Sequence, residues 1–81
     1  MRMHPIAVKP LKKYLLHITF SNGETRRFDV KPYLTIPFFA PLKDEAAFRQ
    51  VFVNGITVEW KNGRDIAPHE LYDNSLPVTP L

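Results

Sequence analysis

Residues 58–72 read VEWKNGRDIAPHELY and contain the only tryptophan of the chain, a turn dipeptide and the best helix start in the sequence. Apolar residues alternate with polar ones from Ile56 to Trp60, and this period of two indicates a half-buried strand. Asn62-Gly63 then predicts a turn, because both residues accept a positive φ at little cost. The stretch therefore predicts a strand with Trp60 as its core anchor, followed by a tight turn.

A short helix is predicted to follow that turn. Pro68 suits the first helical position, where its missing N–H costs nothing, and Glu70 lies favourably in the first turn. Strand, turn and helix are expected to form one unit, with Leu71 and Tyr72 facing back onto the sheet. The expected structural anchors of this unit are Trp60, Asn62, Gly63, Asp65, Pro68, Leu71 and Tyr72.

Length and composition indicate one small domain. A chain of 81 residues buries only about 60% of its unfolded surface, so its stability margin should be small. The chain has no cysteine, which excludes disulfides and thiolate metal sites. No apolar run approaches the roughly 18 residues that a membrane span needs, and the first ten residues lack a signal-peptide core. We expect a cytoplasmic protein without membrane contact.

The second and third strands are predicted to form a hairpin whose register follows from burial. Apolar side chains alternate along residues 14–20, and a loop of three residues, 21–23, pairs Leu16 with Phe28. A loop of two residues would instead place charged side chains opposite the apolar face. The longer loop requires Gly23 in a left-handed conformation, and it places Arg26 on the inner face, where its stem can reach out to solvent.

A second hairpin is predicted over residues 51–58. With Asn54-Gly55 as a two-residue loop, Val53 pairs with Ile56 and Val51 pairs with Val58, all on the face of Trp60.

The remaining pattern completes an α+β fold. Short elements are expected as a strand at 6–9, a turn or loose connection at 10–13, a helical turn at 32–34, a proline-interrupted connector at 35–42 and a helix at 45–50 capped by Asp44. We predict a small antiparallel sheet built from two hairpins, with two or three short helices on one face. Residues 1–73 would form the domain and residues 74–81 a mobile tail.

The order of these signals resembles the uncharacterised bacterial family numbered 2442 among the domains of unknown function. The matching segments are FSNGE at 20–24, FDV at 28–30, LKD at 42–44, EWKNGRDIAP at 59–68 and LY at 71–72. The resemblance implies a small α+β fold with an antiparallel sheet. It also implies a setting beside another small protein, as in toxin–antitoxin-like pairs. It supplies no catalytic residues. Position 67 often holds a capping serine in this pattern, whereas Ala67 stands here and Asp65 is expected to substitute.

Residues that could carry chemistry are sparse. His4, His17 and His69 are scattered, and only Asp65 lies at helical spacing from one of them, His69. Metal sites need three or more converging ligands, and the sequence shows no such cluster. The serines, which could act as nucleophiles, lie in a turn and in the tail. We expect no enzyme activity, no cofactor and no bound metal, with these histidines in capping or surface roles.

Charge divides the chain into a basic and a mildly acidic part. Residues 1–31 carry a net charge of +5, with seven Lys and Arg against two acidic residues, and residues 32–81 carry −2, with four against six. The N-terminal hairpin would present these cations together on its outer side, where His17 also lies. The candidate contacts to nucleic acid or to an acidic partner are Lys9, Lys12, Lys13, Arg27 and Lys31.

Protein binding is the function class that the sequence favours. Sheet edges and the apolar pair Phe38-Phe39 suit strand addition or a shallow groove. We expect a protein partner or a homo-oligomer. The family resemblance implies that this chain is an antitoxin-like or regulatory partner of a neighbouring small protein. The alternative is nucleic-acid binding by the basic hairpin face, which ranks second because the aromatic residues are expected to face inward.

Overall fold

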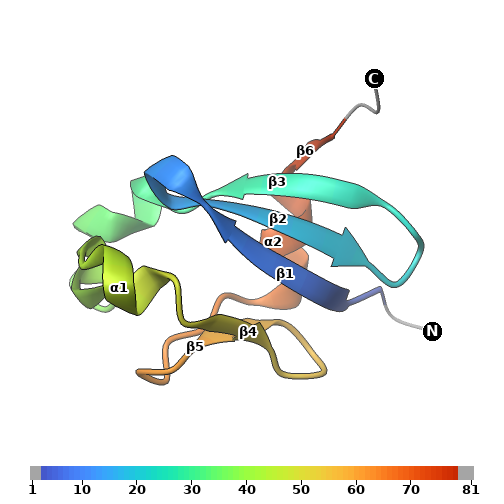
Figure 1. Cartoon of the computed structure of the whole chain (residues 1–81). Coiled ribbons are helices and arrows are strands. Elements are labelled where there is room, and N and C mark those ends of the chain that lie inside the picture. Colours follow the sequence, from blue (N-terminus) through green and yellow to red (C-terminus); the bar gives the residue numbers. More distant parts are fainter. Residues whose placement is uncertain (1–2, 79–81) are drawn as a thin grey trace.

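The structure, a computed structural model, describes residues 3–78 and contains two antiparallel sheets and short helices (Figure 1). The larger sheet has the order β1-β2-β3-β6, formed by β1 (Pro5–Leu11), β2 (Leu15–Phe20), β3 (Thr25–Asp29) and β6 (Leu76–Pro77). The smaller sheet pairs β4 (Val51–Val53) with β5 (Val58–Trp60). The helices are α1 (Glu45–Phe48) and α2 (Pro68–Asp73), with 3-10 turns η1 (Lys12–Tyr14), η2 (Lys31–Thr35) and η3 (Ala40–Lys43). The predicted α+β class is confirmed.

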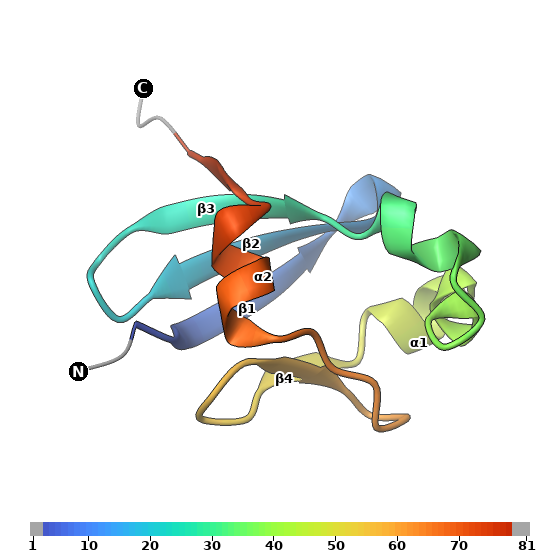
Figure 2. The same cartoon turned by 180° about the vertical axis from the view of Figure 1, so that it is seen from behind.

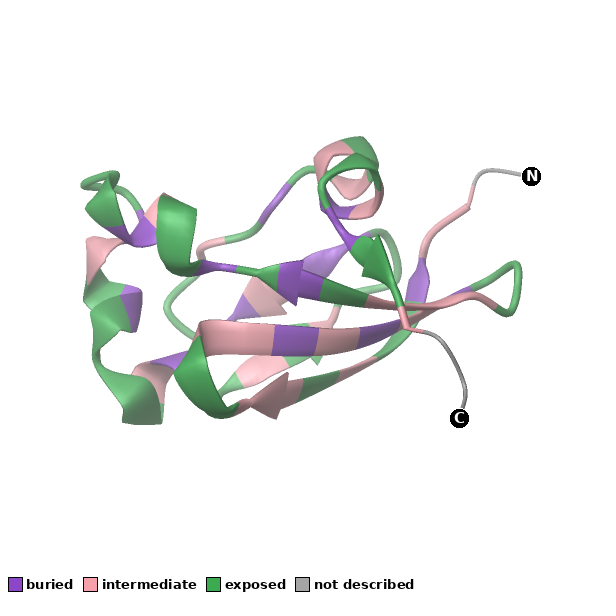
Figure 3. Cartoon of the chain, turned by 90° about the horizontal axis from the view of Figure 1, so that it is seen from above, coloured by how far each residue is buried: buried purple, intermediate pink, exposed green. Residues whose placement is uncertain are grey.

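The larger sheet is covered on one face only. Helix α2 lies across its inner face (Figure 2), whereas no helix lies over the outer face, which is turned to the viewer in Figure 1. Buried and partly exposed residues alternate along β2, as Figure 3 shows. The inner face carries the buried side chains Leu16, Ile18, Phe20, Phe28 and Val30. The alternation of residue types along β2 therefore places its buried side chains on one face of the sheet and its partly exposed side chains on the other.

Trp60 lies in the middle of the core. Its side chain is fully buried, its ring packs near that of Phe48, and its Nε1–H donates to the Phe48 carbonyl at 2.9 Å. This bond satisfies the one polar group of the indole, so the ring is buried without an orphaned donor. Trp60 thus links β5 to the end of α1.

The β2–β3 hairpin has the predicted register. Leu16 lies opposite Phe28, and the Phe20 N–H donates to the Glu24 carbonyl at 2.8 Å across a loop of three residues. Gly23 takes a φ of 89°, the left-handed conformation that this loop requires. The burial argument from the sequence is confirmed here.

The β4–β5 hairpin differs from the prediction by two residues. Val51 pairs with Trp60 and Val53 with Val58, so the loop has four residues and the expected two-residue turn is wrong. The side chain of Asn54 causes the wider loop, because its Oδ1 accepts the N–H groups of residues 56 and 57 at 2.9 and 2.8 Å.

This shift of two residues preserves the faces of the strands. Val51 and Val53 remain on the side of Trp60, because side chains alternate with a period of two. Ile56, expected in the core, is instead 67% exposed at the loop. Thr57, expected to face away from the core, is buried, and its hydroxyl donates to the Ile66 carbonyl at 2.5 Å.

The β1–β2 connection is tighter than the loose turn expected at residues 10–13. β1 continues to Leu11, and the backbone then takes a positive φ at both Lys13 and Tyr14, 63° and 60°. Such conformations are unfavourable for residues other than glycine. The side chain of Tyr14 stabilises this turn: its hydroxyl donates to the Lys43 carbonyl at 2.5 Å, and its ring packs edge-on against Phe48.

Both helices are short, and they begin differently. Asp44 caps α1 as predicted, accepting the Ala46 N–H at 3.1 Å, although α1 ends at Phe48 rather than at residue 50. Helix α2 begins at Pro68 after Ala67, which makes no side-chain cap. Asp65 does not replace that cap: within residues 3–78 it forms only a backbone bridge to β5.

The chain after α2 differs from the mobile tail expected from residue 74. Ser75 is buried, Leu76–Pro77 pair with β3, and the Val78 N–H donates to the Thr25 carbonyl at 3.0 Å. Two residues of pairing carry no periodic signal in a sequence, so this strand escaped prediction. The last part of the expected tail, 79–81, lies outside the described residues.

Candidate binding surface

Three basic side chains form a row across the outer face of the larger sheet. Lys9 lies opposite His17, and His17 lies opposite Arg27, on β1, β2 and β3 respectively. Neighbouring strands are about 4.8 Å apart, so this basic row spans about 10 Å. Lys9 and Arg27 are exposed and His17 is half-buried between them. The prediction that these residues share one face follows directly from the register.

The basic row has no polar partner within residues 3–78. None of its three side chains makes a hydrogen bond or an ion pair there. Lys9 and Arg27 are exposed as well, so their charges are available to an anionic ligand.

The other predicted basic contacts lie at one end of this face. Lys12 and Lys13 are exposed on the left-handed turn η1. Lys31 is already committed, because its Nζ donates to the Lys13 carbonyl at 2.9 Å and lies 3.1 Å from Asp29. The structure thus separates the five predicted cations into two on the sheet, two on the turn and one that holds the turn in place.

Apolar side chains flank the basic row. Leu11 lies opposite Leu15, one position further along β1 and β2 on the same face, and both are half-buried. Leu76 lies opposite Arg27 at the other end of the row and is 70% exposed. The phenylalanines of β2 and β3 are buried on the inner face. The outer face therefore combines cations with leucines and has no aromatic platform among its strands.

Both edge strands of the larger sheet contain prolines. The edge strand β1 contains Pro5 and Pro10, and the edge strand β6 contains Pro77. Proline has no N–H to donate to an added strand, and edge prolines are a common protection against strand-to-strand pairing. β1 also contacts β4, which lies beside it in Figures 1 and 2. The expected strand addition is therefore disfavoured, and the open face remains.

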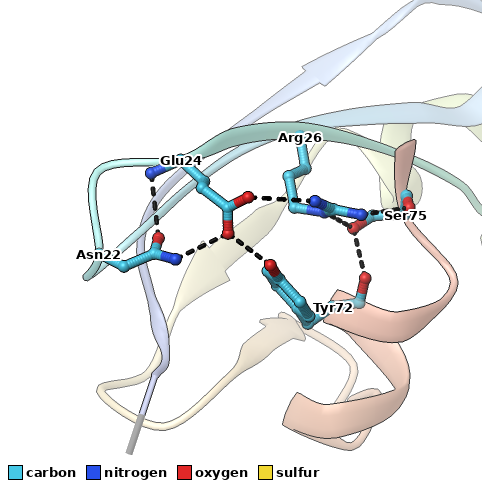
Figure 4. A network of polar contacts seen from close by, with 5 residues as sticks. All are labelled: Asn22, Glu24, Arg26, Tyr72 and Ser75. Carbon is cyan, nitrogen blue, oxygen red and sulfur yellow. Dashed lines mark hydrogen bonds and ion pairs between the residues drawn. The ribbon is translucent and has the colours of Figure 1, made fainter. Parts of the chain in front are cut away.

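Arg26 joins the third strand to the C-terminal segment (Figure 4). Its Nε donates to the Ser75 hydroxyl at 2.5 Å, its Nη2 donates to the Ser75 carbonyl at 2.8 Å, and its Nη1 lies 3.3 Å from Glu24. The guanidinium also stacks over the Tyr72 ring at 4.3 Å. With a side chain only 12% exposed, Arg26 does not reach into solvent as expected. It fastens α2 and β6 to the sheet.

Two tyrosines donate hydrogen bonds to glutamates on other elements. The Tyr72 hydroxyl donates to Glu24, and this bond, followed by one from Asn22, lowers the pKa of Glu24. The same bond raises the pKa of Tyr72. Burial, followed by a hydrogen bond to Glu70, raises the pKa of Tyr33. The bonds favour a neutral phenol at both tyrosines, and they stabilise contacts between elements.

Two histidines that are far apart in the sequence line one cleft. The cleft has a volume of about 590 Å³, and its wall includes His4, Ile56, His69 and Asp73. Sequence spacing could not place His4 and His69 at one cleft. Asp65, which lies at helical spacing from His69, is not among the residues that line it. No group of three or more potential metal ligands is found within residues 3–78.

The apolar connector is divided between core and surface. Phe39 packs in the core, whereas Phe38 is 51% exposed. Arg64 covers Phe38: its guanidinium lies 5.2 Å from the ring centre, and its Nε donates to the Phe38 carbonyl at 2.9 Å. The Phe38-Phe39 pair predicted as a binding element is thus partly a core contact and partly a cation–π contact within the chain.

Comparison with known proteins identifies a family. The family model described as "Protein of unknown function (DUF2442)" matches residues 5–77. This range begins at the first residue of β1 and ends at the last residue of β6. No curated protein and no solved structure gives a significant match. Within residues 3–78, no helix is long and apolar enough to cross a membrane.

Proposed function

We propose that this chain, which belongs to the DUF2442 family of proteins of unknown function, is a small protein-binding module that contacts its partner through the outer face of the larger sheet. The supporting observation is the one-sided covering of that sheet. Helix α2 covers the inner face, and the outer face carries the exposed Leu76, the half-buried Leu11 and Leu15, and two cations without a partner within residues 3–78. A sheet face with exposed apolar and basic side chains is suited to bind a second protein.

The form of this proposal that the family resemblance favours is an antitoxin-like or regulatory role. In that role the partner is another small protein made alongside this chain. Such a role needs a surface rather than a reactive group. The partner would supply the layer that the outer face lacks.

Nucleic-acid binding is the second candidate, and the basic row is the observation that favours it. Cations on β1 and β3, on either side of His17, can contact neighbouring phosphates. One feature ranks it lower. The phenylalanines of β2 and β3 are buried on the inner face, so they are not available for base stacking.

Site-specific photo-crosslinking tests the proposed function. A photoreactive residue replaces Thr19, which lies on the outer face, and in a control variant it replaces Glu45, which is exposed on α1. In native cells we expect one discrete protein to be captured from position 19 and not from position 45. Capture of nucleic acid alone, or equal capture at both positions, would contradict the proposal.

The second candidate has its own test. Labelled DNA and RNA are titrated at about 50 and 200 mM salt, because phosphate contacts weaken steeply over this range. We expect little binding at either concentration. Micromolar binding that falls about a hundredfold at the higher salt, and that is abolished by Lys12→Glu, Lys13→Glu and Arg27→Glu together, would reverse the ranking.

A further inference from the structure

The outer face of the larger sheet carries information about the chemistry of what covers it. Its central feature is the basic row, in which Lys9 and Arg27 stand on either side of His17. The arrangement places cations on β1 and β3 on either side of His17, and the acidic residue next to Arg27 on this face, Asp29, is paired with Lys31 at 3.1 Å. Anions supplied from outside the chain would be attracted to Lys9 and Arg27.

The apolar residues beside the row restrict the source of these anions. Leu11 and Leu15 lie on one side of the row and Leu76 lies at its end, largely exposed. A nucleic-acid backbone offers phosphates but no aliphatic surface to cover these leucines. A protein segment with both carboxylates and apolar side chains satisfies both requirements at once.

The backbone at the end of this face is held in an unfavourable conformation. Lys13 and Tyr14 both take positive φ, and Tyr14 is tied to η3 through the Lys43 carbonyl. Lys31 braces the same turn through the Lys13 carbonyl. The exposed ammonium groups of Lys12 and Lys13 are thereby carried on a fixed turn, which reduces the entropy lost when a ligand binds.

We infer that the partner segment bound at the outer face is acidic and amphipathic, with carboxylates over the basic row and apolar side chains over the flanking leucines. This inference rests on the proposed function and specifies its partner. The ion pairs formed are exposed at their rim, so each cation adds a modest share of the affinity. Together they steer the approach of the partner and exclude basic competitors.

The test uses a defined probe. A synthetic helical peptide of about five turns, with glutamate and leucine on one face, is titrated into the labelled full chain and followed by amide chemical shifts. We expect the shifts to concentrate at Lys9, His17, Arg27 and Leu76. A peptide with glutamine in place of glutamate should bind weakly.

Matched charge variants make the result specific. Lys9→Gln with Arg27→Gln should weaken peptide binding roughly fivefold. The control, Lys43→Gln with Lys61→Gln, removes the same charge from exposed positions away from the outer face and should change the affinity little. Equal weakening by both pairs, shifts confined to another surface, or no shifts at millimolar peptide would overturn the inference, as would tighter binding of a DNA oligonucleotide.

The inference and the proposed function fail in different ways. If position 19 captures a protein equally well in the Lys9→Gln, Arg27→Gln background, the function stands and the acidic partner is rejected. If position 19 captures no protein while the peptide still binds the row, the acidic site stands and the proposed function is rejected.

Discussion

The two faces of the larger sheet are built from alternate residues of the same strands, yet they differ in burial, in polarity and in what covers them. Leu16 and Ile18 are fully buried on the inner face, while His17 between them lies half-buried on the outer face. The inner face is covered by α2 and is close to Trp60 and its neighbours. The outer face is covered by nothing in the described chain. Most of the buried apolar side chains of the sheet therefore lie on the inner face, and the outer face is the one available for binding.

The largest expected difference between the faces is in the free energy of unfolding. Trp60→Ala should lower it by about 3–5 kcal/mol, because the substitution leaves a cavity and removes the bond to the Phe48 carbonyl. A domain of this size has little more than that to lose. Denaturant titration measures the effect. His17→Ala, the matched substitution on the outer face, should stay within about 0.5 kcal/mol of wild type.

Trp60→Phe serves where the alanine variant does not fold. It should be destabilised measurably while remaining folded, since most of the ring volume is kept. A Trp60→Ala variant within about 1 kcal/mol of wild type would contradict the assignment of this side chain as a core residue.

A smaller loss of stability is expected from substitutions where the inner face contacts the C-terminal segment. Ser75→Ala should lower the free energy of unfolding by about 1–2 kcal/mol, because it leaves the Nε of Arg26 without its nearest acceptor in a part-buried site. Thermal or denaturant unfolding measures it. Gln50→Ala is the control, since Gln50 is exposed and its side chain makes no hydrogen bond within residues 3–78. Equal stability of the two variants would indicate that β6 does not stay docked in solution.

The Glu24–Tyr72 pair predicts a dependence on pH. Because the folded-state pKa of Glu24 is lowered, its contribution is fully present above its ordinary value of 4.5 and is lost as the pH falls through the lower folded-state pKa. Wild type should therefore exceed Glu24→Gln in stability at neutral pH, and the gap should narrow in acid. Unfolding curves of both proteins at several pH values measure the gap. A gap that widens in acid would contradict the assignment.

No effect is expected from metal ions. Melting curves in EDTA and with added zinc should superimpose, because residues 3–78 contain no cluster of three potential ligands around His4 and His69. A rise in melting temperature with zinc that disappears in His69→Ala would show that the cleft binds metal and that the sparse-ligand argument is wrong.

The two hairpins show how far sequence patterns reach. In β2–β3, one face is strongly apolar and only one register buries it, so the pairing of Leu16 with Phe28 could be predicted. In β4–β5, registers two residues apart bury the same face, and the choice depends on the side chain of Asn54. The alternation of apolar residues cannot distinguish the two registers, because both place the same strand residues on the buried face.

The sequence was sufficient for the class of fold, the core position of Trp60, the capping of α1 by Asp44 and the placement of Lys9, His17 and Arg27 on one face of the sheet. These features depend on the spacing of residues that are close together in the sequence. Tertiary contacts were needed for the rest. The docking of Ser75 against Arg26, the exposure of Ile56 and the cleft lined by both His4 and His69 depend on which distant segments come together. Long-range packing selects among local arrangements that are nearly equal in energy, and no local pattern records that selection.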